Sequence, residues 1–280
     1  HFNSASMGSV ADIAVIMSIY SSDRPKDVRR AIESILTQEG VSLDFHIQID
    51  GPTAPGVIEC VESLQLEHPN LIVRHRAENR GLAYSLNELL GPVMAANYRY
   101  IARMDADDVS LPGRLAQQRA YMEAHPEVDV LGSCAVEVLE DGTEFFRKRM
   151  PSTHEGCFRL FARTDCLVHP SAFFRRSFFE KAGLYSLDTY YAEDTMLWLQ
   201  GFEKGCRFAN LPEYLYAMQL DHRFFRRRRG WTYAVRLLQL RCKVTRRLHY
   251  GLRGYFYAYA NAASRLLSHS LLRVLYRRAR

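Results

Sequence analysis

The sequence lacks a disulfide framework, a zinc-ligand pattern and a long hydrophobic run. Its six cysteines form no CxxC pair, so we expect free thiols in a reducing compartment, the cytoplasm. The apolar stretch at residues 254–264 ends at Arg265. A spanning helix needs about 20 apolar residues, so none is expected there. No signal peptide opens the chain, and residues 1–9 are expected to be a cloning remnant or disordered.

Acidic residues are absent from the last fifth of the chain. Residues 222–280 hold sixteen of the 37 Lys and Arg residues and none of the 31 Asp and Glu residues. The tail therefore carries a formal charge of +16 and residues 1–221 carry −10. This asymmetry predicts that the tail meets an anionic surface. We expect one folded domain over residues 10–221 and a basic, amphipathic helical tail over 222–280.

Short apolar runs alternate with helical patterns through the first hundred residues. The runs expected as strands are residues 13–20, 45–49, 71–73 and 98–104. Helical spacing of apolar residues lies between them, as at Leu82, Leu86, Leu89 and Leu90. This alternation predicts an α/β fold with a mostly parallel sheet covered by helices on both faces.

Polar residues follow each expected strand: Tyr20, Asp50, His75 and Asp105. In an open α/β sheet these carboxyl ends share one edge, where ligands bind. Asp105, Asp107 and Asp108 are three carboxylates within four residues. A divalent cation holding a diphosphate would neutralise their repulsion. A polar turn or a helix cap after the strand is the alternative for the same residues.

The second half has weaker patterns. Residues 128–139 with the turn at Asp141-Gly142 suggest a hairpin, and a short strand is expected at 172–174. Glu193 and Asp194 open a helix that ends near Gly205, where carboxylates are also favoured by the helix dipole alone. In the tail, helices are expected over residues 230–248 and 254–275.

Five motifs in register resemble the family 2 glycosyltransferases of the GT-A fold. They are Ile16-Met17-Ser18-Ile19-Tyr20, Asp50-Gly51, Asn79-Arg80-Gly81-Leu82, Ala102-Arg103-Met104-Asp105-Ala106-Asp107-Asp108 with Leu111-Pro112, and Ala192-Glu193-Asp194 followed by Leu197-Trp198-Leu199. The likeness covers about residues 12–218. It is closer to bacterial enzymes that build capsule, exopolysaccharide or O-antigen units on undecaprenyl diphosphate.

The resemblance implies a role for each matched residue. Asp105 and Asp107 match the DXD motif, in which the first acid contacts the ribose and the last binds a divalent metal, Mn²⁺ or Mg²⁺, on the nucleotide-sugar diphosphate. Ser18, Tyr20 and Asp50 match the nucleoside site, and Arg80 lies where a basic residue meets the diphosphate. Asp194 matches the general base of inverting members, which takes the acceptor proton.

The chain departs from the family pattern at several points. The family often has two adjacent acids after its second strand, whereas here only Asp50 is acidic. Asp108, the third acid of its cluster, could serve as a metal ligand instead. The family's metal-binding His has only His222 as a weak counterpart. A packing role is the favoured interpretation of His169, and also of Trp198, which could otherwise stack on an acceptor sugar.

The tail has two interpretations. The Arg226–Arg229 run could bind nucleic-acid phosphates, since a polybasic run suits any polyanion. Tyr255, Phe256, Tyr257 and Tyr259 beside basic residues favour a lipid headgroup interface instead. We therefore predict no nucleic-acid partner and a peripheral association with the anionic inner face of the cell membrane.

Together these features predict a metal-dependent, inverting glycosyltransferase that uses a nucleoside diphosphate sugar, UDP being favoured, and a lipid-linked saccharide acceptor. Two rivals remain: a nucleotidyltransferase on a similar sheet, and a membrane-associated scaffold with an inactive transferase domain. No oligomeric state is predicted.

Overall fold

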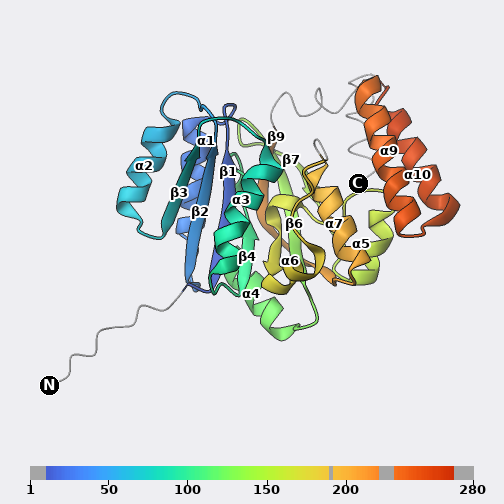
Figure 1. Ribbon diagram of the computed structural model, residues 1–280, viewed down its shortest axis with the longest axis horizontal. Helices are drawn as coiled ribbons and strands as arrows, with labels where there is room; N and C mark the ends of the chain where they lie inside the picture. Colours follow the sequence, from blue (N-terminus) through green and yellow to red (C-terminus); the bar gives the residue numbers. More distant parts are fainter. Residues whose placement is uncertain (1–10, 189–191, 221–229, 268–280) are drawn as a thin grey trace.

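A computed structural model describes residues 11–188, 192–220 and 230–267 (Figure 1). Its strands are β1 (Ile13–Ile19), β2 (Leu43–Asp50), β3 (Leu71–Arg76), β4 (Tyr100–Arg103), β5 (Val109–Ser110), β6 (Val130–Leu139), β7 (Glu144–Lys148), β8 (Phe173–Arg175) and β9 (Phe208–Leu220). The helices are α1 (Pro25–Leu36), α2 (Val57–Glu67), α3 (Leu82–Ala95), α4 (Arg114–Ala124), α5 (His154–Phe161), η1 (His169–Ser171), α6 (Arg176–Ala182), α7 (Glu193–Glu203), α9 (Trp231–Arg247) and α10 (Gly251–Ser264).

One sheet runs through the domain in the order β3-β2-β1-β4-β8-β6-β9-β5, and β7 extends β6 as a hairpin. The first four strands are parallel, so their carboxyl ends share one edge. β8 lies antiparallel to both β4 and β6, while β9 runs parallel to β6. The parallel half and the mixed half therefore meet at β4, the strand that precedes Asp105.

Two apolar layers cover the sheet. Alternate side chains of β1 point to opposite faces: Ile13 and Val15 join the core beneath α1, α2 and α4, whereas Ala14 and Ile16 join the core beneath α3, α5, α6 and α7. Both sets are fully buried, which explains why β1 is a continuous apolar run rather than an alternating one. This sandwich confirms the predicted α/β class with a mostly parallel sheet.

The largest difference from the sequence-based prediction is β9. No strand was predicted at residues 208–220, yet this segment pairs with β6 along its length. Its polar positions and Pro212 obscure the alternation, and two register irregularities in the β6 pairing lie near the proline. Residues 154–161, for which no element was assigned, form α5, whose N-cap Thr153 accepts a hydrogen bond from the Gly156 N–H.

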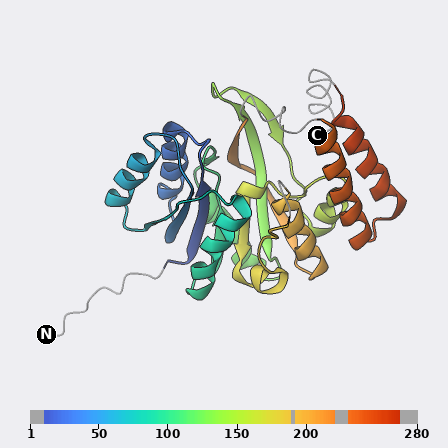
Figure 2. The same cartoon turned by 45° about the horizontal axis from the view of Figure 1, so that its top comes forward.

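Helices α9 and α10 form a hairpin at the end of the molecule opposite α2 (Figures 1 and 2). Gly254 allows this pairing, because a Cβ there would lie 2.6 Å from Thr245 Oγ1. No helix in the described part of the chain is long and apolar enough to span a membrane. Residues 1–9, the expected boundary at 221/222, His222, the Arg226–Arg229 run and the end of the second tail helix lie outside the described residues.

Candidate active site

The carboxyl edge of the parallel strands gathers most of the predicted residues. Ser18 lies in β1, opposite Gln48 of β2, and Tyr20 follows directly after β1. Asp50 is the last residue of β2. Because β1 lies between β2 and β4, this edge also holds Asp105, two residues beyond the end of β4. Strand order thus confirms that these residues share one rim.

Asp50 organises the loop that carries Arg80. Its side chain is 1% exposed, and Oδ1 accepts hydrogen bonds from Arg76 Nε at 3.1 Å and from the Arg80 N–H at 2.9 Å. Oδ2 accepts from the Gly81 N–H at 2.8 Å. Gly51 is required here, because it has φ +80° and a Cβ would lie 2.6 Å from the Asn79 backbone nitrogen. The predicted contact with a nucleobase would have to use the remaining lone pair on Oδ2.

Arg80 reaches the surface of the same rim. Its side chain is half-exposed and its guanidinium stacks 4.1 Å above the Tyr84 ring, while Nη1 lies 3.9 Å from Glu88 Oε1. Such an exposed pair contributes little stability, about 0–1 kcal/mol, so Arg80 is available to meet an anion at small cost.

Asp105 lies at the surface above a buried guanidinium. Arg103 Nη2 is 2.5 Å from Asp105 Oδ1, and the Arg103 side chain is buried whereas that of Asp105 is 37% exposed. The backbone N–H of Asp105 donates to the Tyr216 hydroxyl at 3.2 Å. The carboxylate is therefore fixed in direction yet still open to a ligand.

Asp107 is held through its backbone. Arg30 of α1 donates from Nη2 to the Asp107 carbonyl oxygen at 3.0 Å, and the same nitrogen donates to the Gln219 side chain near the end of β9. Arg30 also bridges to Asp27 at 3.2 Å. The Arg30 guanidinium of α1 thus ties the loop that carries Asp105 and Asp107 to β9, the last strand along the chain.

A fourth acid, Asp23, belongs to this cluster and was not predicted. It is buried, and its Oδ2 accepts a hydrogen bond from the Tyr20 N–H at 2.8 Å. Burial, then the charges of Asp107, Asp105 and Asp27, raise the pKa of Asp23 to about 8, against the lowering effect of that hydrogen bond. In the sequence it resembles an ordinary turn residue, and only its burial beside two other acids distinguishes it.

Asp108, considered as a replacement metal ligand, instead holds β9 in place. It is buried, and its Oδ1 accepts from the Gln219 N–H at 2.8 Å. Burial, then Asp107 and Asp105, raise its pKa well above the usual value. A buried carboxyl whose oxygen fastens β9 is a poor metal ligand, so the geometry argues against Asp108 as a replacement.

The Glu193-Asp194 pair lies in the first turn of α7. Burial raises the pKa of the Tyr185 phenol; Arg103 opposes that shift, and the charges of Asp194, Glu193 and Asp105 add to it. Burial also raises the pKa of Glu193, where Asp105 again contributes. Three carboxylates separated by ninety residues therefore act on one buried phenol.

His169 and Trp198 are packed in the core next to Tyr185. His169 Nε2 is 2.9 Å from the Tyr185 hydroxyl, and its ring packs edge-on against the fully buried Trp198. Burial and the Arg103 charge hold the pKa of His169 well below its usual value, so the imidazole is neutral. The predicted packing roles of both residues are confirmed.

The tail is joined to the Glu193-Asp194 pair through Asp165. Thr195, next to Asp194, donates from Oγ1 to Asp165 Oδ1 at 2.7 Å, and Arg241 of α9 donates from Nη2 to the same oxygen at 2.9 Å. Arg241 Nη1 also donates to the Phe161 carbonyl at 3.3 Å. Arg241 belongs to the basic tail, yet it is buried at this junction.

The acid cluster suits a metal shared with a substrate rather than one enclosed by protein. Within the described residues, no three His, Cys, Asp or Glu side chains are grouped to hold an ion. Asp105 and Asp107 nevertheless offer hard oxygen donors, and burial, followed by the charges of these two acids, raises the pKa values of Asp23 and Asp108 beside them. Mg²⁺ and similar ions commonly use one or two carboxylates and take their other ligands from phosphates and water.

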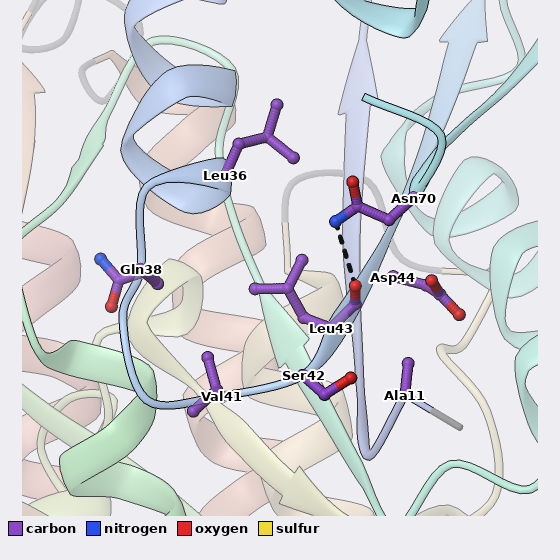
Figure 3. Close-up of a pocket in the computed structure, with 8 residues that line it drawn as sticks. All are labelled: Ala11, Leu36, Gln38, Val41, Ser42, Leu43, Asp44 and Asn70. Atoms are coloured by element: carbon purple, nitrogen blue, oxygen red, sulfur yellow. Dashed lines mark hydrogen bonds between the residues drawn. The ribbon is translucent and has the colours of Figure 1, made fainter. Parts of the chain in front are cut away.

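Two hollows on the surface do not include these acids. One, of about 580 Å³, lies at the amino-terminal edge of the sheet between the ends of α1 and β2 (Figure 3). There Asn70 Nδ2 donates to the Leu43 carbonyl at 3.1 Å. The other, of about 620 Å³, is lined by Gln48, Arg74, His75, Arg76 and Glu88, beside the Arg76 that holds Asp50.

Comparison with known proteins gives matches to one group. The family model for glycosyl transferase family 2 matches residues 14–183. The amylovoran biosynthesis glycosyltransferase AmsE of Erwinia amylovora is 30% identical over 271 residues, which cover 95% of this chain and 98% of AmsE.

Solved structures with the same fold include two glycosyltransferases. S. aureus TarS 1-349 in complex with UDP-GlcNAc gives a TM-score of 0.65 at 18% identity, covering 90% of this chain and 75% of that one. The mannosyltransferase PcManGT of Pyrobaculum calidifontis, in complex with GDP-Man and Mn²⁺, gives 0.64 at 18% identity, covering 91% and 73%. At this identity the likeness concerns the fold, and it confirms the expected GT-A architecture.

Proposed function

The chain belongs to glycosyltransferase family 2, and on that premise we propose that it is a metal-dependent, inverting enzyme acting on a nucleoside diphosphate sugar. UDP is the favoured nucleotide, and TarS, which shares the fold, was solved with UDP-GlcNAc. The observation that carries the proposal is the shared carboxyl edge of β1, β2 and β4, which brings Tyr20, Asp50 and Asp105 together. We infer that the acids of α7 face the same sugar from the acceptor side.

We assign the donor to the rim of the parallel strands. Ser18, Tyr20 and Asp50 contact the nucleoside, with Asp50 already oriented by the Arg80 and Gly81 N–H groups. Arg80 meets the diphosphate. Asp105 and Asp107 hold a divalent cation, Mn²⁺ or Mg²⁺, which would supply electrostatic stabilisation of the leaving nucleoside diphosphate.

We assign the acceptor side to α7. Asp194 takes the proton from the acceptor hydroxyl as that oxygen attacks the anomeric carbon from the face opposite the leaving phosphate. The base must reach the acceptor oxygen across the sugar from the leaving phosphate, and a carboxylate on a different segment from the metal acids meets that requirement. Its position in the first turn of α7, joined to Asp165 through Thr195, supports this role.

The proposed acceptor is a saccharide carried on undecaprenyl diphosphate at the inner face of the cell membrane. AmsE, which matches nearly the whole chain, is described as an enzyme of amylovoran biosynthesis. The tail without acidic residues is suited to an anionic leaflet that presents such a lipid. We therefore place the enzyme in the synthesis of a bacterial surface polysaccharide.

A thermal-shift screen of nucleotide sugars tests the donor assignment. A UDP-sugar should raise the melting temperature in the presence of Mn²⁺, and EDTA should remove most of the shift, because a ligand that binds the native state stabilises it. No shift with any nucleotide sugar would contradict the proposal. Product analysis completes the test, since glycosyl transfer releases a nucleoside diphosphate and nucleotidyl transfer releases diphosphate.

A further inference from the structure

Helix α10 buries its small residues and exposes its large ones. Gly254, Ala258 and Ala262 face inward and are buried. On the outer side, Leu252 is 88% exposed and Phe256 is 69% exposed, and Tyr255 and Tyr259 are also exposed. At 3.6 residues per turn these four side chains form one stripe. A helix that only had to cover the domain would have the opposite arrangement.

The exposure of this stripe does not result from incomplete packing of the helix. The inward glycine and alanines let α10 approach α9 closely, as the contact at Gly254 requires. α10 is also attached to the domain, because Asn261 Nδ2 donates to the Arg163 carbonyl at 2.7 Å. The inner face is therefore satisfied, and the outer apolar face is left for a partner.

The charge that the α9–α10 hairpin carries is of one sign. The exposed side chains of Lys243, Arg246 and Arg253 form no ion pair with any residue that the structure describes. No Asp or Glu occurs anywhere in residues 222–280. An apolar, aromatic stripe beside unneutralised cations complements an anionic lipid surface, with rings at the headgroup level and cations on the phosphates.

We propose that the α9–α10 hairpin is a lipid-binding surface, and that α10 lies in the plane of an anionic bilayer with Leu252, Tyr255, Phe256 and Tyr259 entering the boundary between headgroups and acyl chains. This deepens the proposed function by identifying the surface that brings the site to a lipid-linked acceptor. Because Arg241 joins α9 to Asp165 and Thr195, docking also fixes the direction in which Asp194 faces the membrane.

Vesicle sedimentation of the full chain tests the inference. The wild type should bind vesicles that contain phosphatidylglycerol and bind pure phosphatidylcholine weakly, and high salt should release it. L252S/F256S should weaken binding to the anionic vesicles at least about tenfold, because two apolar anchors are lost. Leu66→Ser is the matched control, since Leu66 is 89% exposed on α2 at the far end and should not matter.

Three outcomes would overturn the inference: no vesicle binding by the wild type, equal loss in the Leu66→Ser control, or a wild-type dimer that the L252S/F256S change converts to monomer without affecting lipid binding. The last would assign the stripe to a second copy of the chain. The metal-dependent thermal shift with a UDP-sugar, measured on the same variants, separates this inference from the proposed function. Failure of the wild type to bind vesicles, with an unchanged thermal shift, would count against this inference alone. Absence of the thermal shift, with vesicle binding unchanged, would count against the proposed function alone.

Discussion

The two sides of the site are built in different ways. On the side assigned to the donor, Tyr20, Asp50 and Asp105 follow adjacent parallel strands, so strand order alone brings them together. On the side assigned to the acceptor, Asp194 opens a helix whose first turn is fixed by Asp165 and by Arg241 from the tail. Backbone pairing positions the first set, and long-range side-chain contacts position the second.

The largest expected effect comes from Asp194→Asn. The amide cannot take the acceptor proton, so turnover should fall about 10³-fold, whereas donor affinity should stay within about threefold. Initial rates of nucleoside diphosphate release and donor titration measure the two quantities. Asp141→Asn, in an exposed turn, is the control. Loss of donor binding in the Asp194 variant would mean that the two sides are not separate.

Asp107→Ala should affect the side of the site that we assign to the donor. Removing one carboxylate from the cation site should weaken Mn²⁺-dependent donor binding about 100-fold, and turnover should fall with it. Calorimetric titration of a UDP-sugar with and without Mn²⁺ measures this. If the variant bound the UDP-sugar in Mn²⁺ with unchanged affinity, Asp107 would not be a ligand of the cation.

Arg241→Met tests whether the tail supports the acceptor side. It should lower turnover about tenfold and the free energy of unfolding by about 3 kcal/mol, because it leaves Asp165 without its buried partner. Donor affinity should not change. Arg247 lies in the same helix as Arg241 and forms a more exposed pair with Glu203 of α7, so Arg247→Met should cost at most about 1 kcal/mol, with full turnover. Equal loss of turnover in both variants would indicate general damage to the hairpin.

The smallest effect concerns Asp23. Its pKa is raised to about 8 in the folded chain, so the unfolded chain ionises first and native stability falls as pH rises from about 4 to about 8. Asp23→Asn removes this penalty while an oxygen remains for the Tyr20 N–H. The variant should be more stable than wild type at pH 8 by about 1–3 kcal/mol and no more stable near pH 4. Denaturant melts without metal across this range provide the measurement.

The donor side was largely predictable from sequence because its signals are local. Each acid or aromatic follows an apolar run, and parallel strands convert that spacing into one rim. Asp23 escaped because a turn aspartate gives no sign of burial. The cues for β9 were hidden by Pro212 and by polar residues whose partners, such as Asp108 and Arg30, come from distant segments.

On the side assigned to the acceptor, the sequence shows the proposed residues but not the contacts that position them. The Glu193-Asp194 motif is visible in the sequence, whereas Asp165 and Arg241 have no local pattern. Arg241 looks like one more member of a basic tail, and only the fold reveals that it is buried against Asp165. Likewise, the outward direction of the α10 stripe depends on how closely Gly254 lets α9 approach.

A crystal structure with Mn²⁺ and the UDP-sugar identified by thermal shift tests the central claim most directly. The account predicts the cation on Asp105 and Asp107, the nucleoside along Ser18, Tyr20 and Asp50, and the Asp194 carboxylate facing the anomeric carbon from the side opposite the diphosphate. Two results would contradict it: a nucleotide bound away from this rim, or an anomeric carbon whose face opposite the diphosphate points away from Asp194 of α7.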